Sequence, residues 1–148
     1  MPFVLQTQVR PDDIDELGHA SNLVYLRWVL EAAVAHSNAA GLGPAEYRAR
    51  GQVFVVRRHE IEYFRSAMPG DAIAIETRVT GFQAATSERQ TTIRRAADEL
   101  VLACARTRWA FVTQASGRPL RIPDDIQALL PAEESDPAWV KHWKRASV

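Results

Sequence analysis

The sequence has a single cysteine, Cys104, among its 148 residues. One thiol excludes an internal disulfide framework, and the four scattered histidines form no CxxC or HExxH spacing, so we expect no metal site. No run reaches the roughly 18 uncharged apolar residues that a membrane span needs. The N-terminus also lacks the charged start and apolar core of a signal peptide. These absences predict a cytoplasmic protein without a membrane span.

The sequence also has no net charge, because its 18 basic residues balance its 18 acidic residues. A net charge of zero with no basic tail argues against nucleic-acid binding. The distribution is uneven, since residues 57–121 hold eleven arginines, no lysine and seven acidic residues. The planar guanidinium suits phosphate, which makes a phosphate-bearing ligand conceivable. Solvated strand faces are the favoured alternative for these arginines.

The chain length predicts one domain over residues 1–148, with residues 131–148 as a C-terminal helical extension. Alternating apolar residues predict a first strand over residues 3–9. A long apolar helix over residues 23–40 follows, which Ser21 or Asn22 can cap and Gly41 ends. A short helical segment and four strands come next, at residues 44–50, 53–64, 72–82, 88–95 and 100–113.

The last part of the chain predicts two short helices, with Asp124 and Asp136 as their caps and Pro137 at the first helical position. In the last strand, alternation places five residues on one face: Val101, Ala103, Ala105, Trp109 and Phe111. The short turns between strands require antiparallel neighbours.

The order of elements favours an α+β fold in which an antiparallel sheet curls around the long helix. A helix that is apolar on most sides is buried best in this way. A small curled sheet leaves exposed edges, and pairing them between subunits hides them, so we expect a homodimer or homotetramer.

The loop before the long helix and its first turns read DIDELGHASNLVYLRW. This motif resembles the signature of hot-dog-fold acyl-CoA thioesterases of the 4-hydroxybenzoyl-CoA thioesterase type. The matching residues are Asp13, Asp15, Gly18, His19, Asn22 and Tyr25. The likeness includes the PGD turn at 69–71 and the GRPLRIP segment, and it extends over roughly residues 3–130.

The resemblance implies a thioester hydrolase that needs no metal or cofactor, with CoA as part of its substrate. It implies that Asp15, the second carboxylate of the pair, acts as nucleophile or general base. Thioester hydrolysis needs such a group near the carbonyl carbon and donors aimed at the developing oxyanion. A carboxylate just before a helix N-terminus can have both, so we expect the oxyanion donors among the backbone N–H groups of residues 22–25.

Several motif residues have two interpretations. His19 either assists Asp15 and orients the substrate or is a hydrogen-bonded structural group of the loop. Asn22 either positions the substrate carbonyl as a catalytic amide or caps the helix. Gly18 marks a tight turn or a close approach to substrate. Tyr25 lines the substrate pocket or packs in the core.

A second candidate region is the polar run Thr86, Ser87 and Arg89, which occupies the segment that contacts CoA phosphates in some relatives. Arg89 is the favoured contact there. Arg27 and Glu31, four residues apart, predict a surface ion pair on the helix, and Cys104 is interpreted as packing filler. Two other functions stay open, namely hydrolysis of thioesters on acyl carrier protein and non-catalytic binding of acyl-CoA.

Overall fold

The computed structural model describes residues 2–146 and is built around one long helix, α1 (Asn22–Ala39). Ser21 has the extended backbone of an N-cap, and its Oγ accepts a hydrogen bond from the Leu23 N–H at 3.3 Å. Gly41, with a φ of +86°, turns the chain away from the helix end. The predicted helix is confirmed to within one residue at each end, and Ser21 is the cap that it uses.

Five antiparallel strands form one sheet in the order β1-β3-β4-β5-β2. Their bounds are Phe3–Gln8 for β1, Gln52–Tyr63 for β2, Ala72–Gln83 for β3, Thr86–Arg95 for β4 and Val101–Thr113 for β5. All five strands were expected from the alternation of apolar residues. The order leaves β1 and β2, the strands on either side of α1 in the sequence, at the two edges of the sheet.

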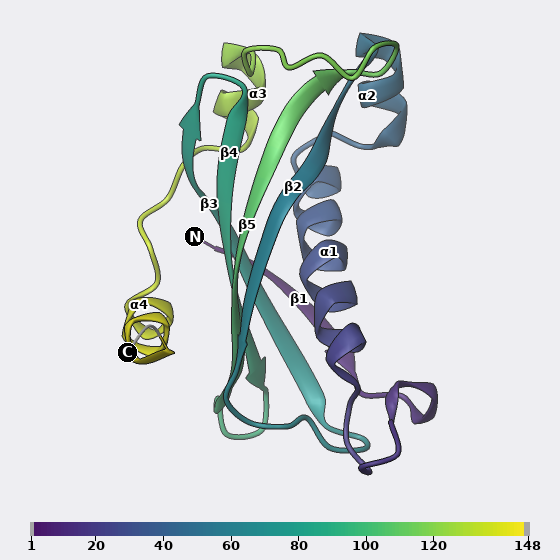
Figure 1. Ribbon diagram of the computed structural model, residues 1–148, viewed down its shortest axis with the longest axis vertical. Helices are drawn as coiled ribbons and strands as arrows, with labels where there is room; N and C mark the ends of the chain where they lie inside the picture. The colour runs from purple at the N-terminus through teal and green to yellow at the C-terminus, as the bar shows by residue number, and fades with distance from the viewer. Residues whose placement is uncertain (1, 147–148) are drawn as a thin grey trace.

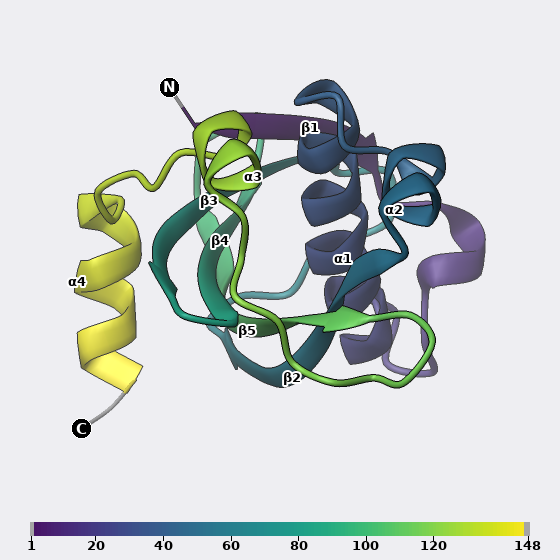
Figure 2. The same ribbon diagram turned by 90° about the horizontal axis from the view of Figure 1, so that it is seen from above.

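The sheet curls around α1, which lies on its concave side (Figures 1 and 2). Trp28 and Ala32 are fully buried there, against inward-facing Ile73, Ile75 and Ile93 of the central strands. Burying side chains of this size contributes about 1.5–3 kcal/mol each. This packing confirms the α+β architecture.

One side of α1 stays uncovered within the chain. Six residues of the helix are buried: Val24, Tyr25, Trp28, Val29, Ala32 and Ala33. Leu23 is 77% exposed and Val34 is 52% exposed. Arg27 and Glu31 form the predicted ion pair on this outer side, at 3.1 Å. Among the helices of residues 2–146, none is both long and apolar enough to cross a membrane.

Two short helices, α2 (Pro44–Arg50) and α3 (Asp124–Leu129), close the end of the fold where α1 terminates (Figure 1). They pack on a second apolar cluster that includes Leu42, Val79 and Phe111. The predicted cap of α3 is wrong by one position, because Pro123 is the N-cap and Asp124 already has helical backbone.

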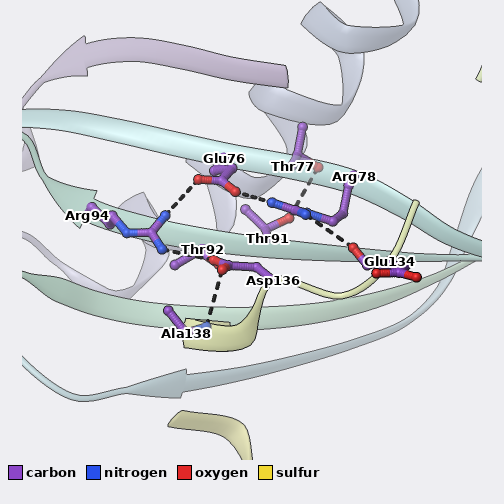
Figure 3. Close-up of polar contacts among 9 residues, drawn as sticks. All are labelled: Glu76, Thr77, Arg78, Thr91, Thr92, Arg94, Glu134, Asp136 and Ala138. Atoms are coloured by element: carbon purple, nitrogen blue, oxygen red, sulfur yellow. Dashed lines mark hydrogen bonds and ion pairs between the residues drawn. The ribbon is translucent and has the colours of Figure 1, made fainter. Parts of the chain in front are cut away.

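Two of the strand arginines, Arg78 and Arg94, form ion pairs on the convex face of the sheet (Figure 3). Arg94 donates to Glu76 at 2.7 Å and to Asp136 at 2.8 Å. Arg78 also donates to Glu76, and to the backbone carbonyl of Glu134 at 3.1 Å. These guanidinium groups are engaged with carboxylates of the chain itself, which argues against a phosphate site at these two arginines. Their side chains are only 12% and 19% exposed, so the expected solvated strand face is wrong for them.

The C-terminal helix α4 (Pro137–Ala146) covers the same convex face (Figure 2). The Trp139 indole N–H donates to the Ala105 carbonyl at 3.0 Å, and the ring stacks on Trp143 with centroids 4.7 Å apart. Beneath Trp139 lie Cys104 and Val101. Burial raises the pKa of the Cys104 thiol to about 12, which fits its interpretation as packing filler.

Val101 corrects one detail of the expected pattern. It was predicted to share a face with Ala103, but it belongs to the outer cluster, whereas Ala103 belongs to the core under α1. The cause is a register shift between β4 and β5, where Ile93 pairs with Ala103 and the next residue, Arg94, pairs with Val101. Such a bulge reverses the alternation of side chains.

Asp136 is the main polar anchor of α4, because it accepts from the Ala138 N–H at 3.2 Å and from Arg94. We predict that Asp136→Ala weakens the docking of α4 on the sheet by about 1–2 kcal/mol, which is the scale of a lost helix cap. Hydrogen exchange of the α4 amides should then quicken about tenfold or more. The matched control is Glu134→Ala, since Arg78 bonds only the backbone carbonyl of that residue. Equal exchange in the two variants would contradict the assignment.

Candidate active site

The loop between β1 and α1 is fixed in place by Asp13, whose side chain is almost fully buried. Its carboxylate accepts from the Arg10 N–H at 2.9 Å and from Arg27 Nη1 at 3.0 Å, and its carbonyl accepts from the Ser21 N–H at 2.9 Å. Burial opposes ionisation, but the hydrogen bonds from Arg27 and Arg10 outweigh it and hold the pKa of Asp13 below its usual 3.8. Asp13 therefore ties the loop to the start of the helix.

Asp15 lies in a tight turn and is one-third exposed. Its Oδ1 accepts from the Leu17 N–H at 2.9 Å, and its backbone N–H donates to the His19 carbonyl at 3.0 Å. Gly18 has a φ of +82°, a conformation that strains any other residue, and its N–H donates to the Asp15 carbonyl at 3.1 Å. The turn interpretation of Gly18 is thereby confirmed, and the carboxylate of Asp15 has a defined orientation with access to solvent.

The same turn brings His19 over Asp15, with its Nδ1 at 3.9 Å from Asp15 Oδ1. The His19 Nδ1 is also 3.3 Å from the Ala20 carbonyl, so the ring has a structural contact as well. Both of its sequence interpretations are compatible with this geometry. Within residues 2–146, no three His, Cys, Asp or Glu side chains gather in a way that would hold a metal ion.

A small hollow of about 140 Å³ adjoins His19 at the start of α1. Its lining residues are His19, Ala20, Asn22, Tyr25, Tyr63, Phe64, Arg65 and Ser66. The structure thus brings three residues of the motif together with the end of β2. The residues at positions 63–66 were not foreseen, because no local pattern connects them with a loop some 40 positions earlier.

Tyr25 packs in the hydrophobic core and also lines the hollow. It is 2% exposed, and its hydroxyl accepts from the Ala67 N–H at 2.8 Å and lies 3.4 Å from the Arg65 carbonyl, to which it donates. Burial raises the pKa of its phenol, so it is neutral near pH 7. Tyr25 therefore fixes the connection that forms the wall of the hollow.

The first turn of α1 has fewer open N–H groups than expected. The Leu23 N–H donates to Ser21 Oγ, and the Val24 N–H donates to the Ser21 carbonyl at 3.0 Å. Of the oxyanion donors expected at residues 22–25, the N–H groups of Leu23 and Val24 therefore already have acceptors within the chain. The Asn22 side chain is exposed and does not act as the cap, a role that Ser21 has taken.

A larger pocket of about 320 Å³ lies at the other end of α1, beside α2. Ser87 and Arg89 line it, together with Tyr47, Phe54 and Trp109. Within one chain, the predicted phosphate-contacting residues are therefore separated from Asp15 by most of the length of α1, roughly 20 Å at 1.5 Å per residue. Arg89 is only 5% exposed and faces α1 inside the curl, so it does not lie on an open edge of the subunit.

Thr86 lines neither the hollow at the start of α1 nor the pocket beside α2. Its hydroxyl donates to the Gln83 carbonyl at 3.0 Å and closes the turn between β3 and β4, where Ala84 has a φ of +51°. This local bond gives Thr86 a structural role. A role in CoA binding stays a prediction for this residue.

Solved structures with the same fold include several thioesterases. A provisionally assigned oleoyl thioesterase from Lactobacillus plantarum superposes with a TM-score of 0.85 at 22% identity; the alignment covers 93% of this chain but 54% of that one, so the chain spans about half its length. A 1,4-dihydroxy-2-naphthoyl-CoA thioesterase from Synechocystis gives 0.81 at 20% identity, over 88% and 96% of the two chains. A Staphylococcus aureus protein solved in complex with CoA gives 0.84 at 13%, over 96% and 93%.

At these identities the structural likeness shows the fold, and the family comes from the sequence. No curated protein sequence matches the chain. The family model of the thioesterase-like superfamily matches residues 9–130, which include the loop, α1 and strands β2 to β5. The chain therefore belongs to the thioesterase-like superfamily and has the hot-dog fold.

Proposed function

We propose that this protein hydrolyses acyl-CoA thioesters in the cytoplasm, with Asp15 as general base or nucleophile. The observation that carries the proposal is the partly exposed Asp15 carboxylate, which accepts from the Leu17 N–H and lies 3.9 Å from His19, a residue that lines the hollow at the start of α1. The family supplies the reaction class, and the CoA complex of the Staphylococcus aureus relative supports CoA as the carrier.

The chemistry needs three functions that residues near the start of α1 can perform. Asp15 either removes a proton from water or attacks the thioester carbonyl itself. In the proposal, the N–H of Asn22, at the positive end of the helix dipole, donates to the oxyanion. His19, close to Asp15, orients the carboxylate or the substrate. Hydrolysis then adds the hydroxyl of water to the acyl carbon, and the departing sulfur of CoA receives the proton.

A second copy of the chain is part of the proposal. The 12-residue strand β2 lies at the edge of the sheet, paired on one side with β5. Beside it, α1 exposes Leu23 and Val34, and β2 itself exposes Val55. A long open edge next to apolar surface favours pairing with a like edge. We therefore propose a homodimer in which the β2 strands of two subunits pair. Two such dimers would form the homotetramer.

Two other functions on the same fold are alternatives to acyl-CoA hydrolysis. Acyl carrier protein in place of CoA would keep the chemistry and change the partner, and the same acyl group on both carriers separates the two. A silent acyl-CoA-binding module would bind CoA esters without releasing thiol. The defined, solvent-accessible carboxylate of Asp15 favours catalysis over silent binding.

Replacing Asp15 by Asn tests the proposed catalytic group. The amide keeps an oxygen that can accept from the Leu17 N–H but cannot act as base or nucleophile, so kcat should fall about a hundredfold or more while the melting temperature stays the same. Free thiol released from acyl-CoA is the readout. Full turnover by Asp15→Asn would overturn the assignment.

The neighbouring variant Asp13→Asn is the matched contrast. Its amide keeps one acceptor oxygen and would present its NH2 donors to either the Arg10 N–H or Arg27, so we expect a loss of about 1–3 kcal/mol in the free energy of unfolding, measured in urea. Because the pKa of Asp13 is lowered on folding, wild-type stability should also fall as the pH drops below about 4, and the variant should lose less there. An unchanged stability would show that Asp13 does not hold the loop.

The proposed dimer predicts that Val55→Lys shifts the protein toward monomer, because it puts a charge on the β2 edge. Light scattering after size-exclusion chromatography gives the mass. Val4→Lys is the control, since Val4 is comparably exposed (42% against 38%) but lies on β1, the opposite edge. A wild-type monomer, or dissociation by Val4→Lys instead, would contradict pairing through β2.

A further inference from the structure

The pocket beside α2 has a mostly apolar wall. Side chains of α1, α2 and four strands surround it, among them Leu42, Phe54, Val79 and Phe82. Register shifts in β2, between Val56 and Arg58, and in β3, between Val79 and Gly81, bend the sheet at this end. At roughly 30 Å³ for each non-hydrogen atom, a volume of about 320 Å³ holds about ten of them.

The one buried cation in this apolar wall is Arg89, within the part of the chain that the structure describes. Both of its side-chain hydrogen bonds come from Nη1, at 2.8 Å to His36 Nδ1 and at 3.1 Å to Thr77 Oγ1. Desolvation lowers the pKa of Arg89 to about 10, against weaker opposing effects of Tyr47 and Glu133, so the group stays charged near pH 7.

His36 fixes the guanidinium without neutralising it. Arginine only donates, so the Nδ1 of His36 must accept and carry no proton. Burial, and then the charge of Arg89, lower the pKa of His36 to about 4, so the ring is neutral near pH 7. Its ring stacks on Phe3 with centroids 5.2 Å apart, which holds it in position. Arg89 is therefore oriented by two neutral groups.

The arginines of the convex face have a different environment. Arg78 and Arg94 each contact a carboxylate, whereas no carboxylate of residues 2–146 lies within 4.0 Å of the Arg89 guanidinium. A buried charge that no carboxylate contacts carries a desolvation cost that a bound anion would offset, and the charge of Glu133, which acts from beyond 4.0 Å, opposes that cost only in part. Trp109, also in the pocket wall, has a buried indole N–H with no partner in the described chain.

We infer that the pocket beside α2 binds a carboxylate on a short apolar body, with the anionic group at Arg89 and the apolar part against Phe54, Val79 and Phe82. The volume suits a chain of six to eight carbons or a single ring. Two sources share this chemistry, namely a free carboxylic acid and the distal carboxylate of an acyl group. The site stands independently of the proposed catalytic role of Asp15, because binding to it requires no turnover.

Calorimetric titration with octanoate tests the site, and octanamide serves as the neutral probe of equal length. Wild-type protein should bind octanoate at least about tenfold more tightly, the scale of a charge-assisted hydrogen bond. Arg89→Met should abolish that preference. Arg108→Met is the control, because Arg108 is exposed on β5 and is not part of the pocket wall, and it should leave the preference unchanged.

A second variant keeps the test decisive if Arg89→Met does not fold. Ser87→Glu retains Arg89 and places a carboxylate two residues away on the same strand and in the same pocket wall. This internal counter-ion should abolish octanoate binding. Equal affinities of wild-type protein for octanoate and octanamide, or octanoate binding that survives Ser87→Glu, would overturn the inference.

Turnover identifies the source of the carboxylate. If the acyl group carries it, the thioester must lie at the Asp15 of a second copy, because roughly 20 Å separates Asp15 from Arg89 within one chain and a six-carbon acyl group is shorter. Arg89→Met should then lower kcat/KM at least about tenfold more for a six-carbon dicarboxylic acyl-CoA than for its monocarboxylic counterpart. If a free acid is the ligand, the two substrates change equally while octanoate binding is lost. Weaker binding of CoA itself with octanoate binding intact would overturn the inference and favour the phosphate contact expected from the sequence.

Discussion

The packing of α1 into the concave side of the sheet is the constraint on which the rest of the structure depends. Trp28 and Ala32 can be buried only if the sheet curls, and the curl separates a concave face with few charges from a convex face rich in ion pairs. The same helix then presents its N-terminus at one end of the curl and forms part of a pocket at the other (Figure 1).

The buried charges at the two ends of α1 have different partners. At the N-terminus, buried Asp13 is neutralised by Arg27 and positions the loop, which leaves the neighbouring Asp15 partly exposed and available for chemistry. At the other end, Arg89 is buried against neutral partners, and its charge is available for a ligand. Asp13 thus has a structural role and Asp15 the proposed chemical one, and buried Arg89 differs from the ion-paired arginines of the convex face.

Much of the fold could be predicted from local pattern. Alternation located all five strands, and the Ser21 to Gly41 segment located the helix, because caps and periodicity are properties of short stretches. The motif around Asp15 also pointed to the family. The bulge that turns Val101 outward, the wall at Tyr63 and the burial of Arg89 could not be predicted, because each depends on which strands become neighbours.

The inward orientation of Arg89 shows the limit most clearly. From the sequence, it is one of eleven arginines in residues 57–121, and nothing local separates it from Arg78 or Arg94. Only the contact with His36, 53 positions earlier, shows that its strand position faces the helix. A resemblance placed it near CoA phosphates, whereas the structure surrounds it with an apolar pocket.

The most direct test of the account is release of free thiol from a panel of short, long, branched and aromatic acyl-CoAs by the purified wild-type protein. The account predicts multiple turnovers for at least one class, with free acid and CoA as equimolar products. Binding of the CoA esters across the whole panel without thiol release would contradict it, and would make the chain a binding module on the hot-dog fold.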